Sequence, residues 1–265
     1  MVARSARTRG RDPVVRPAGG SLRSVEPAEY LDTLRDRSKL LLVSARTDLE
    51  APVRSCPGWT VAKLVAHVGG VWGWAAAVVR TGDRADQASL PEGLSGAELL
   101  EWAEQQAHLA LDALDTADPD SICWTFVGPQ SRRFWFRRQA LETAVHAWDV
   151  QQAVARPGPI APELASDGID EFLTLMLPRQ LKQQPEGWTG QSLHLHSTDS
   201  KGEWVINLGP DSAVSVEHVH RKGDVALQGT ASSLYLWCLN RIPLNEIKVL
   251  GDRAVADHWT AEIAF

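Results

Sequence analysis

The sequence has few cysteines, no long apolar run and an excess of acidic residues. Its three cysteines, Cys56, Cys123 and Cys238, are far apart and odd in number, which excludes a Cys-x-x-Cys zinc knuckle and fits a reducing compartment. No stretch approaches the roughly 20 apolar residues of a membrane span, and the N-terminal tail lacks the apolar stretch and cleavage site of a secretory signal. These absences predict a cytoplasmic protein that is not embedded in a membrane.

The charge is distributed unevenly along the chain. The net charge is −6, but residues 1–23 contain six arginines and one aspartate, so this tail carries +5 and the remainder carries −11. An acidic body does not suit a nucleic-acid-binding protein. Because the tail has no apolar periodicity with which to dock, we expect a disordered basic leader over residues 1–23.

The remaining residues show two kinds of periodicity, which predict two domains. Over residues 24–185, apolar residues recur at helical spacing in four to five segments, which favours a helical bundle. From residue 186 onward, short alternating runs separated by Gly, Pro, Asp and Ser are typical of antiparallel strands. We therefore expect an α plus α+β protein, with a four- or five-helix bundle at residues 24–185 and a small α+β domain with an antiparallel sheet at 186–265.

Several polar residues lie where helix caps belong. Thr60 precedes an apolar helical stripe and is expected to be its N-cap. Ser95 and Glu98 have the spacing of a capping box at the start of the next helix. In the C-terminal domain, Ser232 or Ser233 is the expected cap of a short helix.

Two helices carry residues that could bind one metal ion. Glu142 and His146 are four residues apart, so they lie on the same face of a helix. This pair alone is weak evidence, because such pairs are often solvated ion pairs. His67, however, interrupts a second helix that is otherwise apolar, and a shared metal would satisfy all three polar groups inside a bundle. The alternative is that His67 hydrogen-bonds Glu142 without a metal.

Three ligands of this type leave a coordination position open, which suits catalytic zinc. Ferrous iron uses the same ligand types, so another divalent metal stays possible. Asp149 lies three residues beyond His146 on nearly the same face. It either orients an imidazole or a ligand from behind the metal ligands, or it is an ordinary surface carboxylate.

Two further pairs of histidines are spaced two residues apart, so each pair lies on one face of an expected strand. The pairs are His194 with His196, and His218 with His220. They could bind metal, but solvent-facing strand residues are the more common explanation, and we expect that here.

Four arginines lie near the start of the helix that carries Glu142: Arg132, Arg133, Arg137 and Arg138. They could neutralise an acidic ligand. A solvated helix end explains them equally, so the sequence assigns them no role.

Three segments together resemble one known family. Residues 55–67 resemble its Pro-Gly-Trp turn and histidine-bearing helix, and residues 142–149 resemble its Glu-x-x-x-His-x-x-Asp helix. Residues 229–241, with Gly251 and Asp252 after them, resemble its C-terminal domain. The family is the mycothiol-dependent maleylpyruvate isomerase family of the DinB-like superfamily, and the resemblance extends from residue 25 to the C-terminus.

The resemblance implies a zinc ion held by His67, Glu142 and His146, a sterol-carrier-like C-terminal domain, and mycothiol as the thiol cofactor. Arg241 would hold a carboxylate bidentately and so contribute to cofactor binding and catalysis. An arginine at a helix end could instead interact only with the last helical carbonyls. The family usually has Trp-Gly before this arginine, where the chain has Leu239-Asn240. Asparagine tolerates a left-handed helix cap, so the backbone there is expected to survive.

The function that the sequence favours is thiolate addition to a small electrophile. A metal-bound thiol is deprotonated near neutral pH and becomes a nucleophile. Addition, bond rotation and elimination would isomerise a double bond, whereas addition alone would give a conjugate. The alternatives are a metal-dependent hydrolase that activates water, and a non-catalytic metal-containing protein that binds small molecules. The expected partners are a small electrophile and a low-molecular-weight thiol, with no nucleic acid, and the chain is expected to be a monomer or a weak homodimer.

Overall fold

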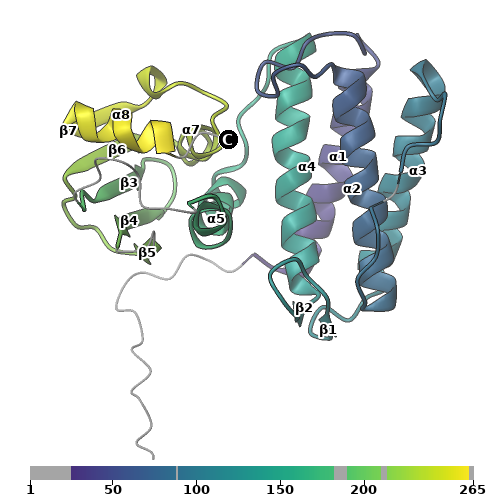
Figure 1. The fold of residues 1–265 in the computed structure, drawn as a ribbon, viewed down its shortest axis with the longest axis horizontal. Coiled ribbons are helices and arrows are strands. Elements are labelled where there is room, and N and C mark those ends of the chain that lie inside the picture. The colour runs from purple at the N-terminus through teal and green to yellow at the C-terminus, as the bar shows by residue number, and fades with distance from the viewer. Residues whose placement is uncertain (1–24, 88, 182–189, 210–213, 263–265) are drawn as a thin grey trace, which may run out of the picture.

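The computed structural model describes residues 25–87, 89–181, 190–209 and 214–262. The expected leader, residues 1–23, lies outside these ranges. Figure 1 shows a bundle of long helices beside a smaller domain that contains a sheet. The expected fold class, a helical bundle followed by an α+β domain, is confirmed.

Four long helices form the bundle within the described part of the chain, and they pack as two pairs. The first pairs with the fourth and the second with the third. They are α1 (Pro27–Ala45), α2 (Val61–Thr81), α3 (Gly96–Asp115) and α4 (Arg133–Val154). A two-stranded hairpin, β1 (Ile122–Cys123) and β2 (Gln130–Ser131), joins α3 to α4. The two helices that carry the expected metal ligands, α2 and α4, belong to different pairs but also contact each other.

The helix starts match the sequence in part. The Thr60 hydroxyl accepts a hydrogen bond from the Lys63 amide at 3.4 Å, so its expected role as the N-cap of α2 is confirmed. Ser95 is the N-cap of α3, but its side chain makes no capping hydrogen bond, and the chain enters the helix through Gly96 at φ 53°. The capping box expected there is therefore wrong.

The helix α2 is apolar because it is a core helix. Its most apolar window has a mean hydropathy of 1.3, so by length and composition alone α2 could cross a membrane. In the bundle, however, most of that window is buried, with Leu64, Val68 and Trp72 completely enclosed. Packing against α3 explains the composition of this helix without a membrane.

The C-terminal domain is built on a five-stranded sheet with the strand order β5-β4-β3-β6-β7. The strands are β3 (Leu193–Ser197), β4 (Glu203–Leu208), β5 (Val214–Glu217), β6 (Val225–Gly229) and β7 (Lys248–Gly251). Three neighbouring pairs are antiparallel, but β3 and β6 are parallel. The antiparallel pairing expected from the sequence is present in three of the four neighbouring pairs, and the parallel pair of β3 with β6 makes the sheet mixed.

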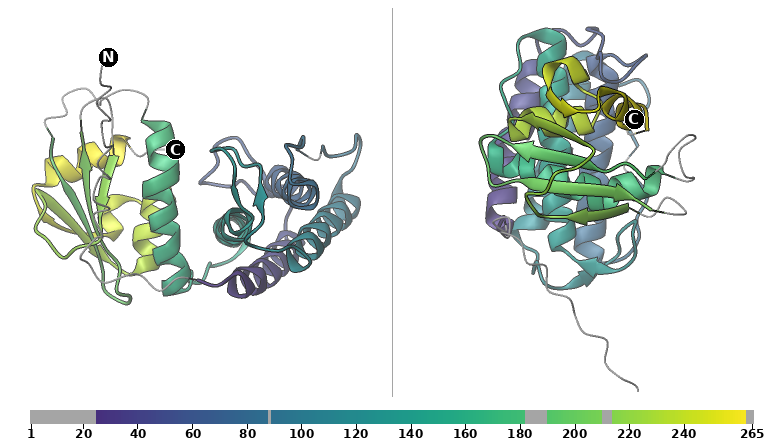
Figure 2. Two further views of the ribbon diagram at one scale, coloured as in Figure 1. Left: turned by 90° about the horizontal axis from the view of Figure 1, so that it is seen from below. Right: turned by 90° about the vertical axis from the view of Figure 1, so that its left-hand side faces the viewer.

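The sheet has one core face and one open face. Leu193, Leu195 and Trp204 are buried in the core beneath the helices. Two helices pack on the sheet, α7 (Ala231–Cys238) and α8 (Arg253–Glu262). No described helix covers the opposite face, which is turned to the viewer in the right-hand view of Figure 2. His194 and His196 lie on that opposite face, because neighbouring side chains alternate along a strand.

The segment after α4 belongs with the C-terminal domain. It contains α5 (Pro162–Glu171), the π-helix η1 (Phe172–Met176) and α6 (Leu177–Gln180). The helix α5 packs on α7, where Gly168 lies so close to the Tyr235 ring that a Cβ would be 2.4 Å from it. The sequence predicts a boundary at 185/186, which would leave α5 in the bundle, but the contact with α7 favours an earlier boundary. We propose residues 155–161 as the boundary.

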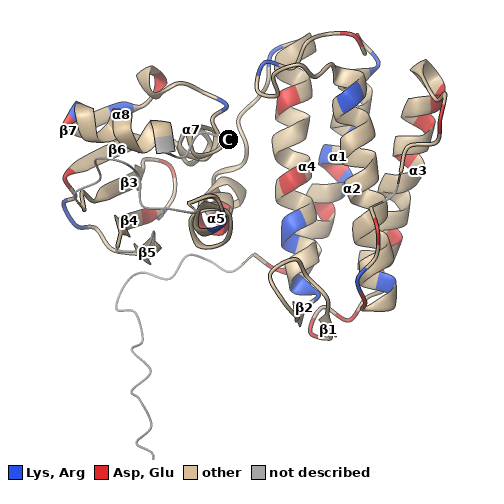
Figure 3. Ribbon diagram, viewed as in Figure 1, with Lys and Arg blue, Asp and Glu red and all other residues tan. Residues whose placement is uncertain are grey.

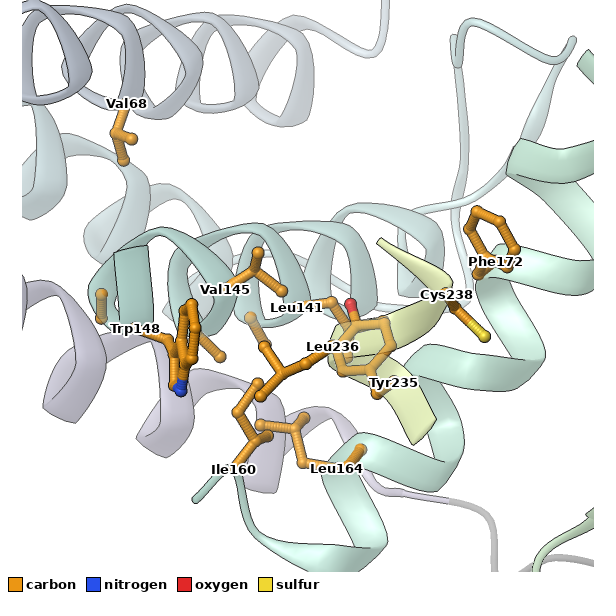
Figure 4. Packing of buried hydrophobic residues seen from close by; sticks show 14 of the residues in the cluster. Val68, Leu141, Val145, Trp148, Ile160, Leu164, Phe172, Tyr235, Leu236 and Cys238 are labelled. Carbon is orange, nitrogen blue, oxygen red and sulfur yellow. The ribbon is translucent and has the colours of Figure 1, made fainter. Parts of the chain in front are cut away.

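The two domains share a hydrophobic interface. Leu141, Val145 and Trp148 of α4 lie on the side of that helix that faces Leu236 of α7, and Ile160 lies beside them (Figure 4). All are buried within one continuous core cluster. This packing fixes the end of α7 against the middle of α4, where the expected metal ligands lie.

The start and end of α7 are both defined by local hydrogen bonds. Thr230 caps the helix by accepting a hydrogen bond from the Ser233 amide at 3.1 Å, so the expected caps, Ser232 and Ser233, are wrong. At the other end Asn240 has φ 57° and is the one non-glycine residue with positive φ among the described residues. The left-handed cap expected at Asn240 is confirmed.

Candidate metal centre

The helices α2 and α4 bring His67, Glu142 and His146 together. Glu142 Oε1 lies 3.1 Å from His146 Nε2 and 3.5 Å from His67 Nε2. The two imidazole rings are 5.5 Å apart and nearly perpendicular. One ligand atom from each residue lies within 4.8 Å of the other two. Two imidazole nitrogens and one carboxylate oxygen therefore converge on one point, as a divalent metal with nitrogen and oxygen ligands requires.

The cluster opens on the side of His67. The side chain of His67 is 34% exposed, whereas that of His146 is 10% exposed. Trp59, from the turn before α2, packs edge-on against the His67 ring with centroids 5.2 Å apart. This contact restricts the ring to an orientation that points Nε2 at Glu142 while leaving one side of the site open to a small ligand.

Arg138 determines which oxygen of Glu142 is free. It lies one helical turn before Glu142 and binds both Glu142 Oε2 and the buried carboxylate of Glu171. Figure 3 shows the basic and acidic bands that α4 carries along its length. Burial raises the pKa of Glu142, but the charges of Arg138 and His146 outweigh it and hold that pKa well below its usual range. Glu142 is therefore ionised, with Oε2 held by Arg138 and Oε1 facing the two histidines.

The sequence assigns Arg138 no role, because a contact with an acidic ligand and a solvated helix end explain it equally. The structure instead buries it between two carboxylates of the protein itself. The spacing of four residues between Arg138 and Glu142 was visible in the sequence and indicates this pair. Glu171 was not identifiable, because it comes from α5 of the other domain.

Asp149 lies directly behind His146 and is completely buried. Its carboxylate accepts hydrogen bonds from His146 Nδ1 at 2.9 Å and from the Ser55 hydroxyl at 2.6 Å. Burial raises the pKa of Asp149, but the hydrogen bond from His146 and the charge of Arg241 lower it to about 2. Since an ionised carboxylate only accepts, Nδ1 of His146 carries a proton and Nε2 faces Glu142. Metal-binding histidines in proteins are commonly oriented in this way.

The cluster is balanced either by a proton or by a metal cation. Burial lowers the pKa of His146, but Glu142 and Asp149 raise it to about 9. Without a metal, His146 is therefore protonated and donates to Asp149 and Glu142 from its two nitrogens. The metal-free alternative from the sequence pairs His67 with Glu142, and these two groups lie 3.5 Å apart. A divalent cation would replace the proton on Nε2, and the donor set fits such a cation.

Arg241 reaches this cluster from the end of α7. The Arg241 amide donates to the Leu236 carbonyl at 2.7 Å, and the Asn240 amide donates to the Trp237 carbonyl at 2.9 Å. These two bonds form a Schellman motif, which needs the left-handed backbone of Asn240. The motif turns the chain so that the Arg241 side chain points back at Asp149.

The guanidinium of Arg241 is already engaged by the protein. Its Nε and Nη2 atoms lie 3.3 and 3.1 Å from the two oxygens of Asp149, and Nη1 donates to the Leu239 carbonyl at 2.7 Å. The sequence had suggested either a fork for a ligand carboxylate or a contact with helical carbonyls. The structure shows the carbonyl contact, and it directs the bidentate fork at Asp149 rather than outward.

Comparison with known proteins shows the family. Residues 31–151 match the model of the mycothiol maleylpyruvate isomerase N-terminal domain, and residues 163–258 match the model of the corresponding MDMPI C-terminal domain. The chain belongs to this family. Membership identifies it as an enzyme, and the start of the second match is consistent with a domain boundary before α5.

Solved structures agree with the family at the level of the fold. Two crystal structures, of the mycothiol-dependent maleylpyruvate isomerase and of a histidine-to-alanine mutant of it, match with a TM-score of 0.57 and 16% sequence identity. Each match covers 85% of this chain and 93% of the other. No curated protein sequence matches significantly.

Cys56 lies near the candidate metal centre, but its thiol is not activated as a nucleophile. It is half-buried in the turn that precedes α2. Burial raises the pKa of the Cys56 thiol, and the negative charge of Asp149 raises it further. The thiol is therefore protonated at neutral pH.

The histidines of the C-terminal domain match the expected exposure only in part. His194 is buried, and together with His196 and His220 it surrounds the carboxylate of Glu203. His218 points elsewhere and contacts Asp170 at 2.7 Å. The expectation that these four histidines face solvent holds for His220, whose side chain is 76% exposed, but is wrong for His194, which is 5% exposed. His196 and His218 are partly buried.

Proposed function

We propose that the chain is a mycothiol-dependent isomerase or S-transferase that adds a thiolate to a small electrophilic substrate. Its metal, zinc or another divalent ion, would be held by His67, Glu142 and His146. The observation that supports this proposal best is the convergence of three ligand atoms on one point, with Asp149 behind His146, in a member of this enzyme family. Mycothiol enters the proposal from the family model and from the crystal structures that the fold resembles.

A divalent cation at this position would lower the pKa of a bound thiol, so that the thiol is available as a thiolate near neutral pH. Asp149 and Arg138 orient the metal ligands and set which of their atoms are free to bind a metal. Asp149 keeps the Nδ1 proton on His146 and leaves Nε2 as the donor atom. Arg138 neutralises Glu142 Oε2 and leaves Oε1 free. Because His67 is the most exposed of the three, the thiol would approach along its open side.

The nucleophile would come from outside the chain. Cys56 is the cysteine nearest the cluster, and its raised pKa keeps it protonated. Cys123 and Cys238 are buried, and burial also raises the pKa of both thiols. None of the three offers a thiolate, so a low-molecular-weight thiol is the reactant that this site lacks and would bind.

The proposal gives Arg241 two roles, one toward Asp149 and one toward an anionic group of substrate or cofactor. Through Asp149 it holds His146 in position, and this is the contact that the geometry supports. A guanidinium carries five N–H groups, so the Nη hydrogens not used by Asp149 and Leu239 remain for an anionic group of substrate or cofactor. We therefore propose Arg241 as a catalytic and cofactor-binding residue whose Nε and Nη2 atoms also bind Asp149.

The reaction type follows from what happens after addition. If the thiol adds to a carbon–carbon double bond, the bond becomes single, can rotate, and is restored in the other isomer when the thiol leaves. This sequence regenerates the thiol, so an isomerase needs it only in catalytic amounts. If the thiol stays, the product is a conjugate and thiol is consumed one for one. Both reactants are small molecules, and a cytoplasmic location is part of the proposal.

The test is turnover of an electrophile such as maleylpyruvate by metal-loaded protein, with and without mycothiol. We expect turnover only with thiol, and its loss in His67→Ala. Thiol recovered unchanged would indicate an isomerase, and thiol consumed in proportion to product would indicate a transferase. Turnover at the same rate without any thiol would overturn the proposal in favour of the hydrolase alternative, in which the same site activates water. The absence of turnover for any electrophile would favour the non-catalytic alternative.

A further inference from the structure

A second group of potential metal ligands lies on the open face of the sheet. The strands β3 and β4 are antiparallel, with His196 directly opposite Glu203 and His194 two residues along the same face. His194 Nε2 and His196 Nδ1 each lie 2.5 Å from the Glu203 carboxylate. The strand register therefore fixes three donor groups side by side, and no loop rearrangement is needed to assemble them.

The fourth donor comes from the segment between β5 and β6. His220 Nδ1 lies 2.9 Å from Glu203 Oε1, although the two residues are 17 positions apart. The same segment approaches His194 closely: a Cβ at Gly223 would lie 3.2 to 3.3 Å from the His194 amide nitrogen and Cβ. Glycine at this position lets the segment lie flat against the strand and present His220 to the cluster.

The three imidazoles surround one point in an arrangement suited to a cation. The ring centroids of His194, His196 and His220 are 5.5 to 6.0 Å apart, and each pair of rings is steeply inclined. One ligand atom from each of the four residues lies within 4.8 Å of the others. In the absence of a cation, all three rings hydrogen-bond to the two oxygens of Glu203. A central cation would instead accept electron pairs from all four groups at once.

Burial and charge favour occupation of this site. His194 is 5% exposed, and Glu203 is largely covered, whereas His220 closes the cluster from the solvent side. The Glu203 carboxylate lies between the three imidazoles, where an ionised carboxylate would offset part of the charge of a divalent ion.

We propose that His194, His196, Glu203 and His220 form a second metal site, which takes a divalent transition metal such as Zn²⁺. Imidazole and carboxylate ligands select zinc and its first-row neighbours over calcium or magnesium. Four protein ligands fill a tetrahedral shell, which is the pattern of a structural site and contrasts with the three ligands on α2 and α4. Its role is to fasten the segment 218–224 to the sheet. The site is in a different domain from the candidate catalytic centre and does not depend on that centre's function.

The test separates the two sites by mutation. Equilibrium dialysis of the full-length protein against Zn²⁺ at micromolar free concentration should give close to two equivalents for wild type and one for His67→Ala. The equivalent left in His67→Ala belongs to the proposed site. Replacing the exposed His220 in that background, as His67→Ala/His220→Gln, removes one of four ligands and should weaken the remaining binding by about tenfold or more. His218→Gln in the same background is the matched control, because His218 lies in the same segment but contacts Asp170.

Thermal stability provides a readout that does not depend on counting metal. Zn²⁺ should raise the melting temperature of His67→Ala, since a ligand that binds the folded state stabilises it, and should raise it much less in His67→Ala/His220→Gln. The His218→Gln control should keep the full zinc-dependent shift. If His67→Ala binds no zinc, or if His220→Gln and His218→Gln bind it equally, the proposal is wrong, whatever the first site binds.

Discussion

Arg241 and Asp149 form an ion pair with Nη2 and Oδ2 3.1 Å apart, although they are 92 positions apart in the sequence. Arg241 follows the last helical turn of α7 in the C-terminal domain, and Asp149 lies on α4 in the bundle, behind His146. The pair is almost completely buried. The C-terminal domain therefore contributes to the candidate metal centre through a residue that touches none of its ligands directly.

The first prediction concerns the energy of this pair. Asp149→Asn keeps the size of the side chain but removes its charge, so it should lower the affinity for metal by about 10- to 100-fold. Arg241→Gln should lower it less, because the carboxylate still orients His146. A double-mutant cycle on the free energy of unfolding should give a coupling of at least about 1 kcal/mol between the two positions.

Additive effects of Asp149→Asn and Arg241→Gln would show that the two residues act independently, contrary to this account. A second pair between α4 and the following domain, Arg137 with Asp167, is a suitable comparison at 3.0 Å. Breaking that pair should lower stability without changing metal affinity, because Arg137 does not contact the cluster.

The second prediction concerns Asn240. At φ 57° glycine is favoured, so Asn240→Gly should keep or slightly raise the melting temperature. Asn240→Val places a β-branched residue in the left-handed region and should cost about 1–3 kcal/mol. Because the Schellman motif aims Arg241, the valine variant should also weaken metal binding, whereas the glycine variant should not. Equal stability of Asn240→Gly and Asn240→Val would contradict the assignment of Asn240 as a left-handed helix cap.

The third prediction concerns pH. The hydrogen bond to Asp170 raises the pKa of His218 from 6.5, against the lowering effect of burial. A raised pKa in the folded state means that charged His218 stabilises the protein below about pH 6.5 and that this contribution is lost as the pH rises through the higher folded pKa. The melting-temperature difference between wild type and His218→Gln should therefore be larger at about pH 6 than at about pH 8.5.

The control for this effect is the partner, Asp170, which also contacts Arg137 at 3.4 Å. In an Asp170→Asn background the His218→Gln substitution should produce a difference that varies little with pH. A difference of the same size at both pH values in the wild-type background would show that protonation of His218 beside Asp170 does not stabilise the protein.

The sequence predicted those parts of the fold and site that depend on local spacing. The helices of the bundle follow from apolar periodicity, and the convergence of Glu142 and His146 follows from one helical turn. His67 was identifiable because an imidazole is unusual inside an apolar helix. The left-handed Asn240 followed from a residue preference that acts on a single position.

The features that the sequence did not predict depend on contacts between distant segments. The parallel pairing of β3 with β6 follows from the path of the chain and leaves no trace in strand periodicity. The cluster around Glu203 needs the segment of His220 to fold over β3, which no local pattern encodes. Likewise, α5 has an ordinary amphipathic pattern, and only its contact with α7 assigns it to the C-terminal domain.

The central claim is that a thiol binds at a metal held by His67, Glu142 and His146, and cobalt substitution tests it most directly. The His220→Gln variant is loaded with Co²⁺, so that the second cluster contributes little, and absorption spectra are recorded before and after mycothiol is added. We predict a new sulfur-to-cobalt charge-transfer band, and no such band when His67→Ala is added to the variant. A cobalt spectrum that the thiol leaves unchanged would contradict the account.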